Sequence, residues 1–167
     1  KKCWEESCLI DPEERCLHCF AAIPERATLC SHCCKNPTLP YPRAGVFEKR
    51  APIRSLLDED TYEAAAGFSY YQWSRLDWPE PDFIVPLRRS RLATAFSKIM
   101  DKPCPALLRK IAWPLHRMQY ELKGDFLEED AVILLFDEGE SLAQLQSACR
   151  AISEAFPKKV YLLSFAI

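Results

Sequence analysis

The pattern of hydrophobic and polar positions is clearest near the end of the chain. Residues 131–136 are six consecutive apolar residues, and they run directly into a short turn, residues 137–140, that contains three acids. An uninterrupted apolar run is typical of a strand that is buried on both faces. Over residues 142–156 the apolar positions then repeat at steps of three and four, which predicts a helix with one apolar face, and Ser141 stands at the N-cap position.

The same pattern analysis predicts further elements along the chain. Strands are expected over residues 45–48, 83–85, 131–136 and 160–165, and helices over residues 53–57, 61–76, 90–100 and 142–156. Residues 106–112 form an apolar element whose type the pattern leaves open. This order predicts an α/β fold with a mostly parallel, doubly wound sheet flanked by helices, which ends in a right-handed strand–helix–strand unit.

A proline-rich stretch divides the chain into two parts. The sequence "NPTLPYP", residues 36–42, has three prolines in seven residues and is typical of a linker. We therefore predict a small N-terminal module with its linker over residues 1–42 and the α/β domain over residues 43–167.

The N-terminal part carries a metal-binding pattern. Cys16 and Cys19 form one CxxC pair, Cys30 and Cys33 form a second, and ten residues separate the pairs. Four cysteines in this spacing predict a tetrahedral structural zinc site. A disulfide framework is the alternative, and the absence of any export signal argues against it.

The remaining cysteines and nearby histidines are weaker candidates. Cys34 adjoins the second pair. His18 and His32 lie between the two cysteines of a CxxC pair, a segment called a knuckle, where a side chain usually points away from the metal. These three rank below the four paired cysteines. Four other cysteines show no matching pair and are interpreted as isolated thiols: Cys3, Cys8, Cys104 and Cys149.

Charge is distributed unevenly along the chain. The net charge is −2, yet residues 86–124 hold nine basic residues against two acidic ones, which is +7 for that segment and −9 for the remainder. Such a split indicates a surface that binds phosphate or nucleic acid. The alternative is that the basic side chains are solvated and distributed over several sides of the fold. Trp113 and Tyr120 would stack bases if exposed and would otherwise be core. The candidate nucleic-acid-binding residues are Arg88, Arg89, Arg91, Lys98, Arg109, Lys110, Arg117 and Lys123.

No segment of the sequence predicts a membrane span. The longest apolar runs, residues 131–136 and the "VYLLSFAI" stretch of residues 160–167, are too short to cross a bilayer, and no signal-peptide pattern is present. We expect a soluble, cytoplasmic protein without membrane insertion.

The acids after residue 136 have two interpretations. Ligands of α/β proteins bind at the carboxyl ends of parallel strands, so these acids would belong to a site. A helix start also attracts a phosphate, through its free N–H groups and its dipole. Acids at that position equally favour the helix dipole, which is a purely structural role.

Several segments together resemble a known family. In order they are "LIDPEER" with the two CxxC pairs, "VFEKRAPIRSLL", "DFIVPLRRSRL", "LKGDF" and "AVILLFDEGESL", followed by a closing strand. This arrangement resembles the ComF-like proteins, which are zinc-bearing relatives of the type I phosphoribosyltransferases associated with natural DNA uptake. The resemblance covers nearly the whole chain and implies a type I phosphoribosyltransferase-like fold.

The resemblance also implies a ligand and a set of site residues. The ligand would be phosphoribosyl diphosphate with Mg²⁺, beside the structural zinc. Asp137 and Glu138 match the catalytic acids that contact the ribose hydroxyls. The implied phosphate-binding residues are Gly139 and Ser141 on the 5′-phosphate side, and Arg88, Arg89 and Arg91 on the pyrophosphate side, where forked guanidinium donors suit phosphate oxygens.

The loop after the acids departs from the family pattern. Family members have several more residues between the paired acids and the glycine, whereas here Gly139 follows Glu138 directly. Glu140 then places a negative charge where the phosphate would lie, at a cost of roughly 3 kcal/mol for a charge at about 5 Å. Glycine lets the backbone approach a ligand such as a diphosphate closely, and the whole chain has four glycines. We therefore expect a degenerate site.

Three function classes follow. The first is a non-catalytic ComF-like protein that acts in DNA uptake by binding single-stranded DNA or a protein of the uptake machinery, such as its helicase. The second is an active phosphoribosyltransferase with a shortened phosphate loop, and the third is a zinc-ribbon protein-interaction module. The shortened loop favours the first class over the second, and the basic segment favours it over the third.

Overall fold

The computed structural model describes residues 9–24, 27–48, 61–113, 117–123 and 131–167. Its elements are η1 (Pro12–Glu14), β1 (Arg43–Phe47), α3 (Tyr62–Ser74), β2 (Phe83–Pro86), α4 (Arg91–Met100), β3 (Leu108–Trp113), β4 (Arg117–Leu122), β5 (Val132–Asp137), α5 (Leu142–Ser153) and β6 (Lys159–Ala166). None of the helices in these ranges combines the length and apolar character that a membrane crossing requires.

Four of the strands form one parallel sheet in the order β1-β6-β5-β2. β3 and β4 form a separate antiparallel hairpin. The predicted α/β class with a mostly parallel sheet is therefore confirmed. Because the sheet strands run in one direction, their carboxyl ends meet at a single edge, and β5 brings Asp137 to that edge between β2 and β6.

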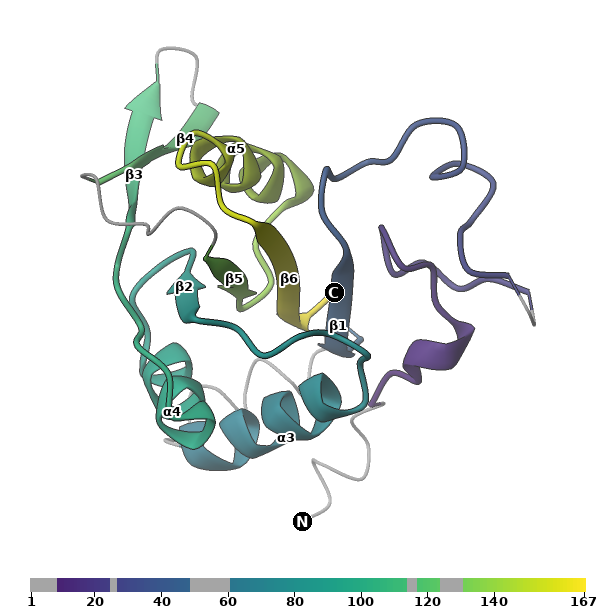
Figure 1. Cartoon of the computed structure of the whole chain (residues 1–167), viewed down its shortest axis with the longest axis horizontal. Helices are drawn as coiled ribbons and strands as arrows, with labels where there is room; N and C mark the ends of the chain where they lie inside the picture. The colour runs from purple at the N-terminus through teal and green to yellow at the C-terminus, as the bar shows by residue number, and fades with distance from the viewer. Residues whose placement is uncertain (1–8, 25–26, 49–60, 114–116, 124–130) are drawn as a thin grey trace.

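The sheet is covered on both faces, which explains the apolar run in β5. Leu134 and Phe136 pack with α3 and α4, whereas Ile133 and Leu135 pack with α5. Figure 1 shows these three layers, with α3 and α4 on one side of the sheet and α5 and the β3–β4 hairpin on the other. Since successive side chains of a strand point to opposite faces, Asp137 follows Ile133 and Leu135 on the α5 side.

Helix boundaries agree with capping signals in the sequence. Ser141 caps α5 in a capping box with Gln144, as its position predicts. Ser90 caps α4 by accepting a hydrogen bond from the backbone N–H of Ala93, and the C-cap residue Asp101 has the left-handed conformation. α5 ends at Ser153, three residues before the predicted end.

Other predicted elements differ in type or extent. The apolar element over residues 106–112 is β3 with part of the loop before it, and β1 covers residues 43–47 where residues 45–48 were expected. The predicted helix over residues 53–57 lies outside the described residues. α3 lies within the predicted residues 61–76.

The cysteine-bearing segment packs against the α/β layers. Ile10 and Phe20 are buried in the same cluster as Val46 of β1, and Leu39 of the proline-rich stretch is buried in the cluster beneath α5. A Cβ on Gly45 would lie 2.4 Å from Ile167 Cδ1 and 3.3 Å from a ring carbon of Phe20, so the missing side chain makes room chiefly for Ile167 and also for Phe20 of the cysteine-bearing segment. The expected domain boundary at residue 42 stays a prediction.

Candidate functional site

The four paired cysteines converge on one point. The Sγ atoms of Cys16, Cys19, Cys30 and Cys33 all lie within 4.8 Å of one another. Cys19 and Cys30 are 3.6 Å apart, close to the sulfur–sulfur separation of about 3.8 Å that follows from tetrahedral Zn–S bonds of about 2.3 Å. All four thiols are free. The predicted ligand set is confirmed as a cluster that is close enough to hold a metal ion, and none of its four cysteines is in a disulfide.

Backbone N–H groups around the cluster stabilise the thiolates of Cys16 and Cys30, whereas burial raises the pKa of Cys19 to about 12 and also raises that of Cys33. The N–H of Cys33 points to Cys30 Sγ at 3.4 Å and is the chief cause of the lowered pKa of Cys30. Burial acts to raise the pKa of Cys16, but backbone N–H groups from both knuckles outweigh it and lower that pKa to about 6. Thiolates are the form that binds zinc, so this donor arrangement suits the metal.

The weaker metal candidates stay outside the cluster. His18, His32 and Cys34 are not among the grouped ligand atoms of the described residues, and Cys34 is exposed. Cys149 is on the buried face of α5, and Cys104 is half-buried beside α4. Cys3 and Cys8 lie outside the described part of the chain.

Asp137 occupies the centre of the sheet edge. The residue is fully buried, and its Oδ1 accepts hydrogen bonds from the backbone N–H groups of Gly139 at 3.1 Å and Glu140 at 2.8 Å. Burial raises the pKa of Asp137, and those two N–H groups oppose the rise. Its Oδ2 is buried without a hydrogen-bond partner among the residues that the structure describes.

An arginine that follows β2 lies against the acidic turn at the end of β5. Arg88 follows β2 and donates from Nη2 to Glu138 Oε2 at 2.8 Å, while its Nε lies 3.9 Å from Glu140 Oε1. The Glu138 side chain is 11% exposed and that of Glu140 is 17% exposed. The hydrogen bond to Glu138 raises the pKa of Arg88. This guanidinium, predicted to hold phosphate, therefore holds two carboxylates of its own chain.

The backbone N–H groups of the turn between β5 and α5 are hydrogen-bonded to acceptors of the same chain. The N–H groups of Gly139 and Glu140 bond to Asp137, and the N–H of Ser141 bonds to Gln144 Oε1 at 3.1 Å. The N–H of Gln144 in turn bonds to the Ser141 hydroxyl. Gly139 has a φ of 121°, a conformation that favours glycine, so the turn is tight as well as short.

Tyr120 on β4 adds a polar group that the sequence pattern did not place at this edge. It is 6% exposed, and its hydroxyl has no hydrogen-bond partner in the described residues. Burial raises the pKa of Tyr120 to about 12, and the carboxylates of Glu140 and Asp137 add to the rise. Tyr120 is thus core, which excludes the base-stacking role considered for an exposed ring. The Trp113 side chain is outside the described part.

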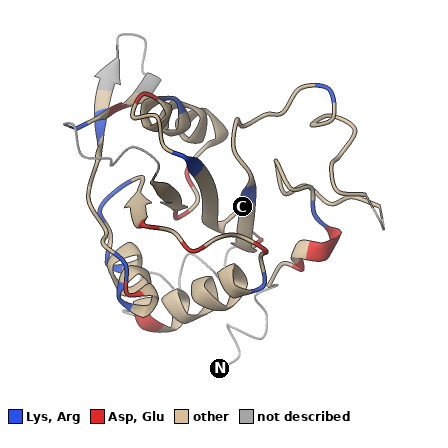
Figure 2. Ribbon diagram, viewed as in Figure 1, with Lys and Arg blue, Asp and Glu red and all other residues tan. Residues whose placement is uncertain are grey.

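The basic residues separate into groups (Figure 2). Arg89, Arg91 and Lys98 line an open cavity of about 1200 Å³ beside α4, together with Tyr62 and apolar side chains that include Ile99. The Arg91 guanidinium lies 5.8 Å from the centre of the Tyr62 ring. We call this cavity the α4 groove.

Apart from Arg88, the other predicted nucleic-acid contacts lie on the β3–β4 hairpin or directly after it. Arg109 is ion-paired with Glu121 across β3 and β4. Lys110 and Lys123 are exposed. The Arg117 side chain lies outside the described part of the chain. The structure therefore places three of the eight candidates in the α4 groove and engages two others with carboxylates.

No protein-family model matches the sequence, and no curated protein matches it significantly.

Proposed function

We propose that this chain is a ComF-like protein with a type I phosphoribosyltransferase-like α/β domain and a structural zinc site, whose phosphoribosyl diphosphate site no longer supports transfer. Its activity in this proposal is binding, with single-stranded nucleic acid held in the α4 groove during DNA uptake. Zn²⁺ would be held by Cys16, Cys19, Cys30 and Cys33, and it would contribute folding energy.

The proposed loss of transfer depends on one observation: backbone N–H groups of the β5–α5 turn already donate hydrogen bonds to the same chain. A bound 5′-phosphate needs free backbone N–H groups, and those of Gly139, Glu140 and Ser141 already have acceptors within the chain. Glu140 would also repel the phosphate. Because a misplacement of about 1 Å can cost on the order of a hundredfold in rate, a missing cradle removes turnover.

Support for nucleic-acid binding comes from the α4 groove. Three cations line an open cavity with an aromatic ring, and Glu63 is the acid among the described lining residues. Arg91 and Lys98 are seven residues apart on α4, so they lie on one face of the helix about 10 Å apart along its axis. Phosphates of an extended strand would meet both, which is the usual sequence-independent mode of binding.

Removal of the groove cations tests this proposal. We expect the zinc-loaded chain to bind a single-stranded oligonucleotide with an affinity that falls as salt rises. Replacing Arg89, Arg91 and Lys98 by alanine is expected to weaken binding at least about tenfold and to reduce the log–log salt slope by about 2, since each contact to a single strand contributes about 0.7. Calorimetric titration at several salt concentrations measures both.

A matched control removes the same charge elsewhere. Lys35, Lys158 and Lys159 are exposed and lie outside the groove, so their triple alanine variant has the same net charge. We expect it to bind within about twofold of the unaltered chain. Equal losses in both variants, or binding that is insensitive to salt, would contradict the proposal.

Titration with the magnesium complex of phosphoribosyl diphosphate tests the loss of transfer. We expect no pyrophosphate release with any common nucleobase, and at most weak magnesium-dependent binding that Asp137→Asn abolishes. The asparagine keeps an acceptor for the turn N–H groups and removes the charge. Pyrophosphate release that disappears in this variant would show that the short turn is functional.

A further inference from the structure

Arg43 lies between the cysteine cluster and the sheet. It is the first residue of β1, and its backbone N–H donates to the carbonyl of Leu17 in the first knuckle at 3.2 Å. Its Nε donates to the Ser164 hydroxyl on β6 at 3.0 Å. One residue therefore joins the knuckle to the interior of the sheet by both its backbone and its side chain.

Arg43 lies near ionisable groups from two different parts of the fold. Ser164 is the register partner of Asp137 across β5 and β6, which brings Arg43 near that carboxylate. Arg43 also lines a cavity of about 510 Å³ with Cys19 of the metal cluster. Burial lowers the pKa of Arg43, and Asp137 followed by Cys19 offsets that effect most strongly.

We propose that Arg43 is a positioning residue shared by the cysteine metal centre and the acidic end of β5, so that zinc binding and the charge on Asp137 are coupled. The inference depends on the metal cluster and not on nucleic-acid binding.

The direction of the coupling follows from charge. Zinc with four thiolates carries a net charge of −2, so a nearby half-buried cation favours the loaded site. Asp137 competes for the same cation, because both groups lie near one guanidinium. Linkage makes the effect reciprocal: whatever Asp137 does to zinc affinity, zinc does to the ionisation of Asp137.

A double-mutant cycle on zinc affinity tests the coupling. Zinc affinity of the full chain is measured at fixed pH by competition with a chelator for the unaltered protein, Arg43→Met, Asp137→Asn and the double variant. We expect Arg43→Met to weaken zinc binding about tenfold and Asp137→Asn to tighten it severalfold. In the Arg43→Met background, Asp137→Asn is expected to change the affinity by less than about twofold.

Two further variants separate charge sharing from structural support. Arg43→Lys keeps the cation and is expected to recover most of the affinity lost in Arg43→Met. Arg15→Met removes a second arginine from the same cavity, one that pairs with Glu48 at 3.5 Å, and is expected to stay within about twofold of the unaltered chain.

The outcome for Asp137→Asn decides the proposal even if Arg43→Met fails to fold. Unchanged zinc affinity in that single variant would overturn it, and so would an equal change in both Arg43 backgrounds. Because no oligonucleotide is present, failure here is distinguishable from failure of the proposed binding function.

Discussion

Loss of the metal is expected to unfold the N-terminal segment and to destabilise the α/β layers with it. Metal analysis of the purified chain should give about one equivalent of zinc, and Cys16→Ser should lose it. Structural zinc contributes apparent binding free energies of about 10–16 kcal/mol in zinc-finger peptides, so the loss is large on the scale of a domain's stability. Because Phe20 and Ile10 belong to the main core cluster, the thermal midpoint of the whole chain should fall.

Cys34→Ser is the matched control for the metal site. Cys34 is exposed, adjoins Cys33 and lies outside the ligand cluster, so the variant should keep one equivalent of zinc and the thermal midpoint of the unaltered chain. Purified protein without metal, or with the paired cysteines joined in disulfides, would contradict the zinc assignment.

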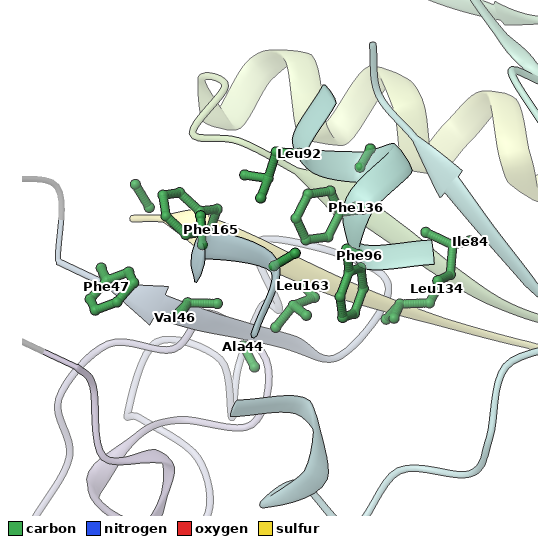
Figure 3. Packing of buried hydrophobic residues seen from close by; sticks show 14 of the residues in the cluster. Ala44, Val46, Phe47, Ile84, Leu92, Phe96, Leu134, Phe136, Leu163 and Phe165 are labelled. Carbon is green, nitrogen blue, oxygen red and sulfur yellow. The ribbon is translucent and has the colours of Figure 1, made fainter. Parts of the chain in front are cut away.

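Truncation of Phe136 is expected to have the second largest effect. This ring is fully buried near the end of β5 and stacks on Phe96 of α4, with 4.9 Å between the ring centres. Figure 3 shows the two rings among the other buried side chains of this cluster. Phe136→Ala should lower the free energy of unfolding by about 3–5 kcal/mol, because it removes buried apolar area and leaves a cavity. Urea unfolding followed by circular dichroism measures the change.

Phe156 provides the comparison on the surface. Its side chain is 83% exposed, so Phe156→Ala should change the free energy of unfolding by less than about 0.5 kcal/mol. A loss below about 1 kcal/mol for Phe136→Ala would mean that this face of the sheet is not packed as described.

Features encoded within a few residues could be predicted from the sequence. The apolar run of β5, the capping serine of α5 and the two CxxC pairs each signal their structure locally, and the structure has all three. The βαβ order also predicted parallel pairing of β5 and β6. These features depend on periodicity, on capping chemistry and on ligand spacing, which neighbouring residues determine.

Features that depend on distant contacts were not predicted. The β3–β4 hairpin lacks a two-residue turn signal, and its strands interleave cations with apolar residues, so no period marked it as a hairpin. The pairing of Arg88 with Glu138 requires β2 to lie beside β5, which the chain order alone does not show. The roles of Arg43 and Tyr120 depend on the same tertiary arrangement.

The position of β1 in the sheet bears on how the chain is made. Its sheet partner is β6, and Arg43 and Ser164, which the two strands bring together, are 121 residues apart in sequence. On the ribosome, β1 is synthesised long before β6, so it has no parallel partner while the intervening helices emerge. Pairing over such a separation is slow, and an unpaired apolar strand is prone to aggregate. The four paired cysteines are synthesised before β1 and do not require β6, so zinc can bind before the parallel sheet is complete during biosynthesis.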